Sequence, residues 1–479
     1  MFRYIHLPLT IFYFIFLCEI NCFSLKSPFK FGSPITPLTT DDDPGEPLFL
    51  TPYLERGDIE LAQNLSQVTS LDASSWVKSY SGLFTVNKKY ESNMFFWYFE
   101  AASDPDNAPV LIWLQGGPGA TSLFGLFTEN GPFDVDENGN TVKRKYSWHL
   151  NHHLLYIDNP VGTGFSFTNS DDGYVQNEEE VAANLYETLR QFYILFPHLK
   201  SRPLFLSGES YAGKYVPAFG FAIDQKNEDP QKELVMNLQG MAIGNAWSDP
   251  VHQVQMGDRL YQLGLIDSNT LKIFHDYEKR GIQMIKDEDY LGAFMLFDVL
   301  LDGDMTPSGS IMKNATGITF PYNYLAQREP KSYLSKLISN PMWRKAIHVG
   351  NLTFNSNDGV NGNRVANNLM LDVMKSVAPW TEYLLNKYRM VFYNGQLDLV
   401  CPYPQEVNHL KHLKFNDADK YKTAKRMIWK VDDDIAGYVK EAGNLVEVLV
   451  RDSGHMVPTD QPKWAFDLIT RVTHGKKFI

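Results

Sequence analysis

A serine in a short turn between an apolar run and an amphipathic stretch could act as a nucleophile. Ser210 lies in the turn 208–213 (Gly-Glu-Ser-Tyr-Ala-Gly), directly after the apolar run 204–206. This is the strand–turn–helix context of a nucleophile elbow, in which a sharp turn raises the serine hydroxyl above a sheet edge. Gly208 and Ala212 are small enough for strand and helix to approach, although Ala212 departs from the strict G-x-S-x-G pattern. The alternative is an ordinary helix start capped by Ser210.

A nucleophilic serine needs a base, and the base needs an orienting acid. Asp398 and His455 each follow a short strand-like apolar run, and they come after Ser210 in the order acid, then histidine. That order, with each residue at the carboxyl end of a strand, is the one expected when a serine stands on an elbow of this kind. The sequence therefore predicts a Ser210–Asp398–His455 triad. Asp452 competes as the acid, but it would share one short turn with His455.

Acyl transfer also needs donors for the oxyanion. One backbone N–H is expected from the residue after the nucleophile, Tyr211, and the other from a Gly-rich turn after an earlier strand. The turn 116–119 (Gly-Gly-Pro-Gly) fits, and we choose Gly117 as the donor. A Gly-rich loop could instead cradle phosphate, but no Lys-Ser/Thr pair follows this one.

The elements that position these residues alternate between short apolar runs and helical stretches. That alternation predicts an α/β fold, namely an α/β-hydrolase fold with a mixed, mainly parallel sheet covered on both faces. Between about 247 and 385 the strand pattern stops, which predicts an inserted helical lobe. The predicted organisation, in chain order, is a signal peptide (1–22), a leader or mobile arm (23–50), a first core part (51–246), the lobe (247–385) and a second core part (386–479).

The first residues, 1–22, have a basic start and an apolar core that is too short to span a bilayer, as in a signal peptide. No later stretch predicts a membrane span, and a net charge of -12 argues against nucleic-acid binding. Exported chains can carry glycans, and Asn64, Asn314 and Asn351 stand in acceptor triplets. Cys401 is the only cysteine outside the signal peptide and its end, so no disulfide is expected in the mature chain.

Six motifs in order resemble those of the serine carboxypeptidase family, over residues from about 80 to the C-terminus. They are Trp-Leu-Gln-Gly-Gly-Pro-Gly at 113–119, Glu-Asn-Gly-Pro at 129–132, Asp-Asn-Pro-Val-Gly-Thr-Gly-Phe-Ser at 158–166, Gly-Glu-Ser-Tyr-Ala-Gly at 208–213, Asn-Gly-Gln-Leu-Asp at 394–398 and Gly-His-Met-Val-Pro at 454–458. Gln115, Thr-Pro-Tyr-Leu at 51–54 and the missing disulfides resemble the vitellogenic-like branch of this family.

The resemblance implies an enzyme that releases single residues from peptide or protein C-termini at acid pH through an acyl-enzyme, with no metal or other cofactor. It also implies that Gln115, Glu129 and Glu209 bind the substrate's terminal carboxylate. Gln115 is one methylene longer than the Asn that the family more often has there. Two carboxylates can hold a third only if protons are shared among them, because like charges in close contact raise one pKa. The alternative for Glu129 and Glu209 is that they are solvated surface acids, and without the resemblance we would favour this alternative for Glu129.

The same resemblance places Cys401 like a free thiol found near the active site of some members. If it is accessible, bulky mercurials should slow the enzyme, whereas as a small buried hydrophobe it would be inert. We expect secretion or lysosomal delivery, and the sequence leaves a homodimer open. Two other functions remain to be weighed. One is an esterase or acyltransferase with the same triad, and the other is a non-catalytic protective or storage protein.

Overall fold

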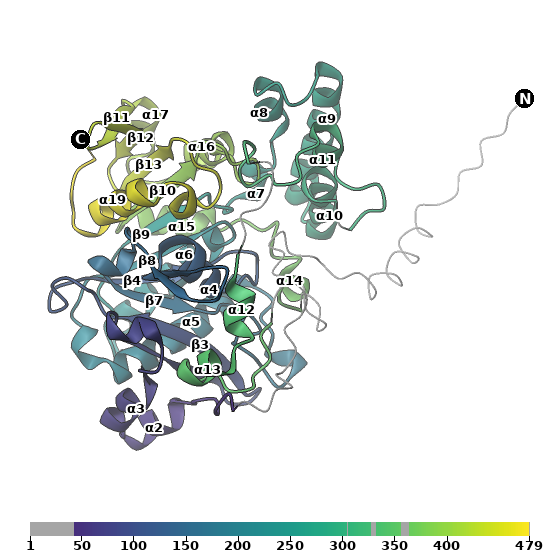
Figure 1. Ribbon diagram of the computed structural model, residues 1–479. Helices are drawn as coiled ribbons and strands as arrows, with labels where there is room; N and C mark the ends of the chain where they lie inside the picture. The colour runs from purple at the N-terminus through teal and green to yellow at the C-terminus, as the bar shows by residue number, and fades with distance from the viewer. Residues whose placement is uncertain (1–42, 304, 327–331, 356–363, 479) are drawn as a thin grey trace, which may run out of the picture.

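The computed structural model describes residues 43–303, 305–326, 332–355 and 364–478, so the predicted signal peptide lies outside the described residues (Figure 1). An 11-stranded sheet forms the centre of the molecule. Its strands are, in spatial order, β1 (Gln67–Val68), β2 (Ser79–Asn87), β3 (Ser92–Phe99), β7 (His153–Ile157), β4 (Val110–Leu114), β8 (Leu204–Glu209), β9 (Leu238–Gly244), β10 (Arg389–Gly395), β13 (Leu445–Val450), β12 (Asp434–Ala442) and β11 (Met427–Val431). A separate small hairpin pairs β5 (Phe133–Val135) with β6 (Thr141–Lys143).

The strands from β7 through β13 in this order run parallel to one another, and antiparallel strands continue the sheet at both edges. Every residue of β4 and β7 is buried. Continuous apolar runs of this kind form strands that are covered on both faces, since alternate side chains enter opposite layers. Ile112 joins one hydrophobic core, while Leu111 and Trp113 join the other. The predicted α/β-hydrolase fold with a mixed, mainly parallel sheet is confirmed.

The helices outside the lobe frame this sheet. They are α2 (Thr51–Arg56), α3 (Ile59–Ser66), α4 (Ser122–Phe124), the π-helix η3 (Gly125–Asn130), α5 (Glu178–Leu195), α6 (Ala212–Glu228), α16 (Tyr403–His412), α17 (Ala418–Thr423), α18 (Val457–Asp460) and α19 (Pro462–Thr473). Single 3-10 turns add η2 (Asp72–Ser75), η4 (Trp148–Leu150), η5 (Asp171–Gly173) and η6 (Pro197–Leu199). Helices α5 and α6 pack together, with α6 against β8 and β9. Helix α6 therefore leaves the Ser210 turn directly over the middle of the sheet.

Between β9 and β10 the described residues form helices and no strand. These helices are α7 (Pro250–Gln253), α8 (Gly257–Gln262), α9 (Ser268–Lys286), α10 (Tyr290–Leu301), α11 (Ile311–Thr316), α12 (Leu334–Ile338), α13 (Pro341–Ala346), α14 (Arg364–Leu369) and α15 (Ala378–Leu385). Helices α8 to α11 project from the core as one group (Figure 1) and contribute most of a small hydrophobic cluster of their own. Helices α12 and α13 instead add side chains to one of the two main cores.

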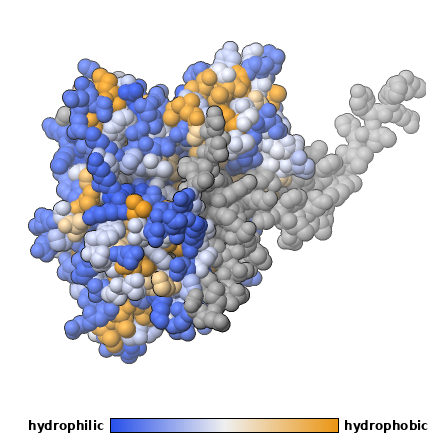
Figure 2. All heavy atoms as spheres, in the orientation of Figure 1, coloured by the Kyte–Doolittle hydropathy of each residue, from blue (hydrophilic) through white to orange (hydrophobic). Residues whose placement is uncertain are grey.

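The surface of the lobe is partly apolar. Figure 2 shows apolar side chains gathered over the α8 and α9 region, where Tyr261 and Ile273 are 46% and 47% exposed. Across the described ranges, no helix has the length and apolar character needed to cross a membrane.

Two features of the fold lie outside the predicted elements. Strands β11 and β12 extend the sheet beyond β13, although the alternating exposed and buried residues of β12 indicate a strand less clearly than the buried runs do.

At the other end of the chain, the last residues of the predicted leader pair with the sheet edge. Leu50 N–H donates to Leu83 O at 2.9 Å, and the Leu50 side chain is fully buried. Residues 48–50 therefore belong to the folded body.

Candidate active site

Ser210 stands between β8 and α6 with a backbone φ of 62°, in the left-handed region that side chains other than glycine rarely adopt. Hydrogen bonds on both sides hold this strained turn. Ser210 N–H donates to Gly244 O at 2.9 Å, and Trp247 N–H donates to Ser210 O at 2.9 Å. A Cβ on Gly208 would collide with the carbonyl oxygen of Leu114. The glycine two residues before Ser210 is therefore needed for close approach of β8 to its neighbour, as the elbow pattern predicts.

The structure brings His455 and Asp398 together. His455 Nδ1 donates to Asp398 Oδ2 at 2.7 Å, and both side chains are fully buried. The second ring nitrogen of His455, Nε2, has no hydrogen-bond partner within the described residues. It is thus free to exchange a proton with a reacting group. The competing acid, Asp452, has a side chain that is 62% exposed and lies near Arg451.

Lobe residue Tyr322 helps to place the histidine. His455 N–H donates to Tyr322 O at 2.6 Å, and the two rings meet edge to face with centroids 5.2 Å apart. Sequence reasoning did not find Tyr322, because it lies in a loop of the lobe with no motif around it.

The sheet order β8, β9, β10, β13 explains why Ser210, Asp398 and His455 lie at one edge of the sheet, because each follows the carboxyl end of one of these parallel strands.

The Gly-rich turn after β4 lies against the elbow. A Cβ on Gly116 would be 2.6 Å from the backbone nitrogen of Tyr211 and 2.8 Å from the Cβ of Ser210. Gly117 has a φ of 114°, which strains any side-chain-bearing residue. The turn that carries Gly117 therefore adjoins the elbow that carries Ser210 and Tyr211.

Gln115, Glu129 and Glu209 form a buried polar cluster beside this turn. Gln115 Nε2 donates to Glu209 Oε1 at 2.7 Å, and Trp113 Nε1 donates to Gln115 Oε1 at 2.9 Å. The amide of Gln115 is therefore oriented with its donor towards the acid. Both carboxyl oxygens of Glu129 and Oε2 of Glu209 are buried without a hydrogen-bond partner among the described residues.

Burial controls the charge of this pair. It raises the pKa of Glu129 from 4.5 to about 7, against the opposing effect of the nearby Glu209 and Gln115 side chains. Burial, followed by the charge of Glu129, raises the pKa of Glu209 well above its ordinary value. The pair consequently keeps a proton in acidic solution. Solvated surface acids, the alternative interpretation from the sequence, are excluded by this burial.

Arg144 supports the turn that carries Glu129, and no pattern in the sequence indicated this role. Its guanidinium donates to Phe127 O at 2.7 Å and to Gly131 O at 3.1 Å, so it holds the middle of the π-helical turn and the residue that ends it. Burial lowers the pKa of Arg144, whose nearby carboxyl groups act in the opposite direction.

Cys401 lies near the candidate acid, but its thiol is not accessible. The residue is 4% exposed, and its backbone N–H donates to Asp398 Oδ2 at 3.1 Å. Burial raises the pKa of the Cys401 thiol well above its ordinary value. A buried, protonated thiol is a poor nucleophile, so this burial favours the small-hydrophobe interpretation over sensitivity to mercurials.

Comparison with known proteins agrees with this geometry. The family model described as serine carboxypeptidase matches residues 70–475. The venom serine carboxypeptidase of Apis mellifera is 50% identical over 445 residues, which cover 92% of this chain and 94% of that protein. The chain belongs to the serine carboxypeptidase family. The vitellogenic carboxypeptidase of Aedes aegypti is 51% identical over 433 residues, covering 90% of each protein. These similarities confirm the family and its vitellogenic-like branch.

Among solved structures, the prohormone-processing carboxypeptidase Kex1 of Saccharomyces cerevisiae superposes with a TM-score of 0.65 at 24% identity, covering 86% of this chain and 94% of that one. This likeness bears on the fold alone. Family membership makes the chain a serine-type carboxypeptidase, a hydrolase that acts on peptides. The comparisons support neither the esterase nor the storage alternative.

Proposed function

We propose that Ser210 attacks the carbonyl of the last peptide bond while His455 accepts its proton through Nε2. Asp398 holds the other nitrogen of the ring and stabilises the imidazolium that forms. The N–H groups of Gly117 and Tyr211 stabilise the oxyanion. His455 then protonates the leaving amino group, and water hydrolyses the acyl-enzyme by the same proton transfers in reverse order.

We further propose that Gln115, Glu129 and Glu209 bind the substrate's C-terminal carboxylate. The observation that carries this proposal is the set of buried, unpartnered oxygens on Glu129 and Glu209 beside the Ser210 turn. A buried polar atom without a partner is costly, and a ligand that supplies the missing hydrogen bonds removes that cost. An acid pair that keeps a proton can donate to a carboxylate, whereas two anions would repel it.

The first experiment tests the nucleophile. Ser210→Ala should lower peptide hydrolysis by about three or more orders of magnitude, because only binding and the oxyanion hole would then remain. A fluorophosphonate probe should label the wild type at Ser210 and leave the variant unlabelled. Activity that survives in the variant, with labelling of another serine, would overturn the assignment.

The second experiment tests the carboxylate site through pH. With the pKa of Glu129 near 7, KM for a peptide with a free C-terminus should be lowest in acidic solution and rise as the pH passes neutrality. The triad responds in the opposite direction, because His455 must be neutral to act as a base. An amidated peptide lacks the terminal charge, so its KM should not show this rise. Glu129→Gln should reduce the difference between the two profiles. Equal KM values for the two peptides at every pH would rule out the carboxylate role.

Delivery to the secretory pathway or lysosome is part of the same proposal. Asn64, Asn314 and Asn351 are all exposed, as glycan acceptors must be. Secreted protein from insect cells should shift in mass after glycosidase treatment, and Asn→Gln changes at these positions should remove the shift. A secreted product with no mass shift would contradict glycosylation, and retention in the cytosol would contradict export.

A further inference from the structure

Asn245 is a buried residue at the carboxyl end of β9, between the strands that carry Ser210 and Asp398. Its backbone φ is 43°, in the left-handed region that Asn tolerates better than most residues. Its Nδ2 donates to Asp398 Oδ2 at 2.7 Å, and its Oδ1 accepts from Gly395 N–H at 3.1 Å. A flipped amide would place two donors and two acceptors against each other, so these two contacts fix its orientation.

Asn245 donates to the same carboxylate oxygen of Asp398 as His455 does. Asp398 Oδ2 accepts from Asn245 Nδ2 at 2.7 Å, from His455 Nδ1 at 2.7 Å and from Cys401 N–H at 3.1 Å. The other oxygen, Oδ1, accepts from Val400 N–H at 2.7 Å. A carboxylate that is bonded on both oxygens cannot rotate without breaking a hydrogen bond, so its acceptor stays directed at His455.

The chain that follows Asn245 ties the same segment to the nucleophile. Trp247 N–H donates to Ser210 O at 2.9 Å, and Ser248 Oγ donates to Gly213 O at 2.7 Å, within the first turn of α6. Residues 245–248 therefore contact the elbow on one side and the candidate acid on the other.

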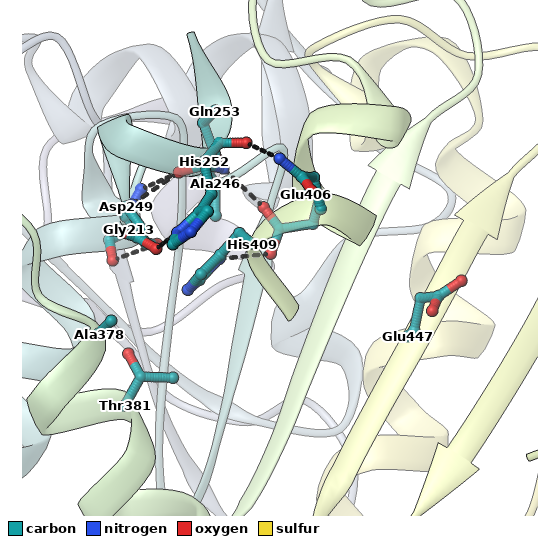
Figure 3. Close-up of polar contacts among 12 residues, drawn as sticks. Gly213, Ala246, Asp249, His252, Gln253, Ala378, Thr381, Glu406, His409 and Glu447 are labelled. Carbon is teal, nitrogen blue, oxygen red and sulfur yellow. Dashed lines mark hydrogen bonds and ion pairs between the residues drawn. The ribbon is translucent and has the colours of Figure 1, made fainter. Parts of the chain in front are cut away.

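A network of buried side-chain hydrogen bonds from α7 and α16 holds residues 245–248 in place (Figure 3). Gln253 of α7 donates from Nε2 to Ala246 O at 2.7 Å and to Glu406 Oε2 of α16 at 3.1 Å. Gln253 Oε1 accepts from Ser248 N–H at 2.8 Å. Beyond it, Glu406 Oε1 and His409 Nδ1 lie 3.2 Å apart. The segment is thus fixed to α16, the helix that follows Asp398 in the chain.

We propose that Asn245 is a positioning residue for the peptidase reaction, which holds the Asp398 carboxylate in the orientation that receives the His455 Nδ1 proton. The inference rests on the proposed roles of Asp398 and His455. Asn245 does not touch the substrate in this scheme. It acts through Asp398, and the segment 245–248 sets the distance between the acid and the Ser210 turn.

Two variants of Asn245 test the proposal without straining the backbone. Asn245→Gly removes the donor at a position where glycine adopts the φ of 43° without strain. Loss of a hydrogen bond to a charged group should lower kcat about ten- to a hundredfold, with KM changed less than about threefold. Glu288→Gly is the matched control, since Glu288 has a φ of 60° in an exposed loop of the lobe and should leave kcat unchanged.

Asn245→Asp distinguishes positioning from a merely structural role. When protonated, the carboxyl group introduced by this substitution can still donate to Asp398, so activity in acidic solution should approach that of the wild type. As the pH rises the two carboxylates repel each other, and activity should fall at a pH where the wild type is still active. A packing role would give no such dependence, because Asn and Asp have nearly the same shape.

A double-mutant cycle completes the test. Asp398→Asn alone should cost about four orders of magnitude, as loss of the orienting acid does in serine proteases. If Asn245 acts through Asp398, adding Asn245→Gly should cost less than about threefold more. Losses that multiply in the cycle, or wild-type kcat in Asn245→Gly, would overturn the proposal. Full activity in Asp398→Asn would instead refute the proposed triad, so the two failures are distinguishable. If Asn245→Gly does not fold, the pH profile of Asn245→Asp decides, and a profile like that of the wild type would refute the inference.

Discussion

Glu178 is a buried acid that has no proposed role in the reaction, although it lies close to Tyr211, and its charge should control how stability depends on pH. It occupies the first turn of α5 with 1% exposure, and neither carboxyl oxygen has a hydrogen-bond partner within the described residues. Burial raises its pKa from 4.5 to about 8, although the nearby Lys214 charge acts in the opposite direction. Glu178→Gln keeps the shape of the side chain and removes its proton equilibrium.

The raised pKa of Glu178 makes the folded state lose stability as the pH rises. Above its ordinary pKa of 4.5 the carboxyl of Glu178 ionises in the unfolded chain, while the folded chain holds the proton up to about pH 8. The group's contribution to stability is therefore full below pH 4.5 and falls as the pH rises towards 8. Each pH unit in this window costs about 1.4 kcal/mol. Between about pH 5 and pH 7 the wild type should lose about 2–3 kcal/mol through Glu178 alone.

Thermal unfolding measures this loss. For a chain of this size, an unfolding entropy of about 2 cal/mol/K per residue converts 2–3 kcal/mol into a Tm change of about 3 °C. Glu178→Gln should therefore flatten the decrease in Tm between pH 5 and pH 7 by about 3 °C. The exposed neighbour Glu179 gives the matched control, and Glu179→Gln should leave the slope unchanged. Parallel Tm–pH curves for the wild type and Glu178→Gln would contradict a raised pKa of Glu178.

Two further predictions concern other buried groups. Lys214 and Asp372 form a buried ion pair with Nζ and Oδ2 2.6 Å apart, and the partly exposed Lys375 lies 3.8 Å from Asp372 Oδ1. Lys214→Met should cost about 3 kcal/mol, because Lys375 alone would then compensate the buried charge of Asp372. The double variant Lys214→Met/Asp372→Leu should recover most of that loss in urea unfolding. A double variant no more stable than Lys214→Met would contradict this account. Cys401 should not react with a disulfide reagent such as DTNB in the native protein and should react fully in guanidinium, whereas rapid native labelling would contradict its burial.

The candidate catalytic residues could be named from the sequence because their signal is local. Ser210, Asp398 and His455 each follow a short apolar run, and a buried parallel strand needs such a run whatever surrounds it. The fold then brings the carboxyl ends of these strands to one sheet edge. The supporting contacts were not predictable in this way. Asn245 meets Asp398 across 153 residues of chain, and Tyr322 meets His455 across a similar span, so only the tertiary structure reveals these partners.

Glu178 shows most clearly where sequence reasoning fails. It is the first of three consecutive glutamates at a helix start, a pattern that normally indicates a solvated, dipole-favoured face. In the fold, only Glu178 of the three is buried, because α5 packs against α6 and turns this position towards Lys214 and Tyr211. Burial raises the pKa of Glu178, as it does for Glu129 and Glu209 beside Ser210. In both places, burial keeps carboxyl groups protonated in acidic solution, where the folded state loses no stability by ionising them and the candidate carboxylate-binding pair holds its proton.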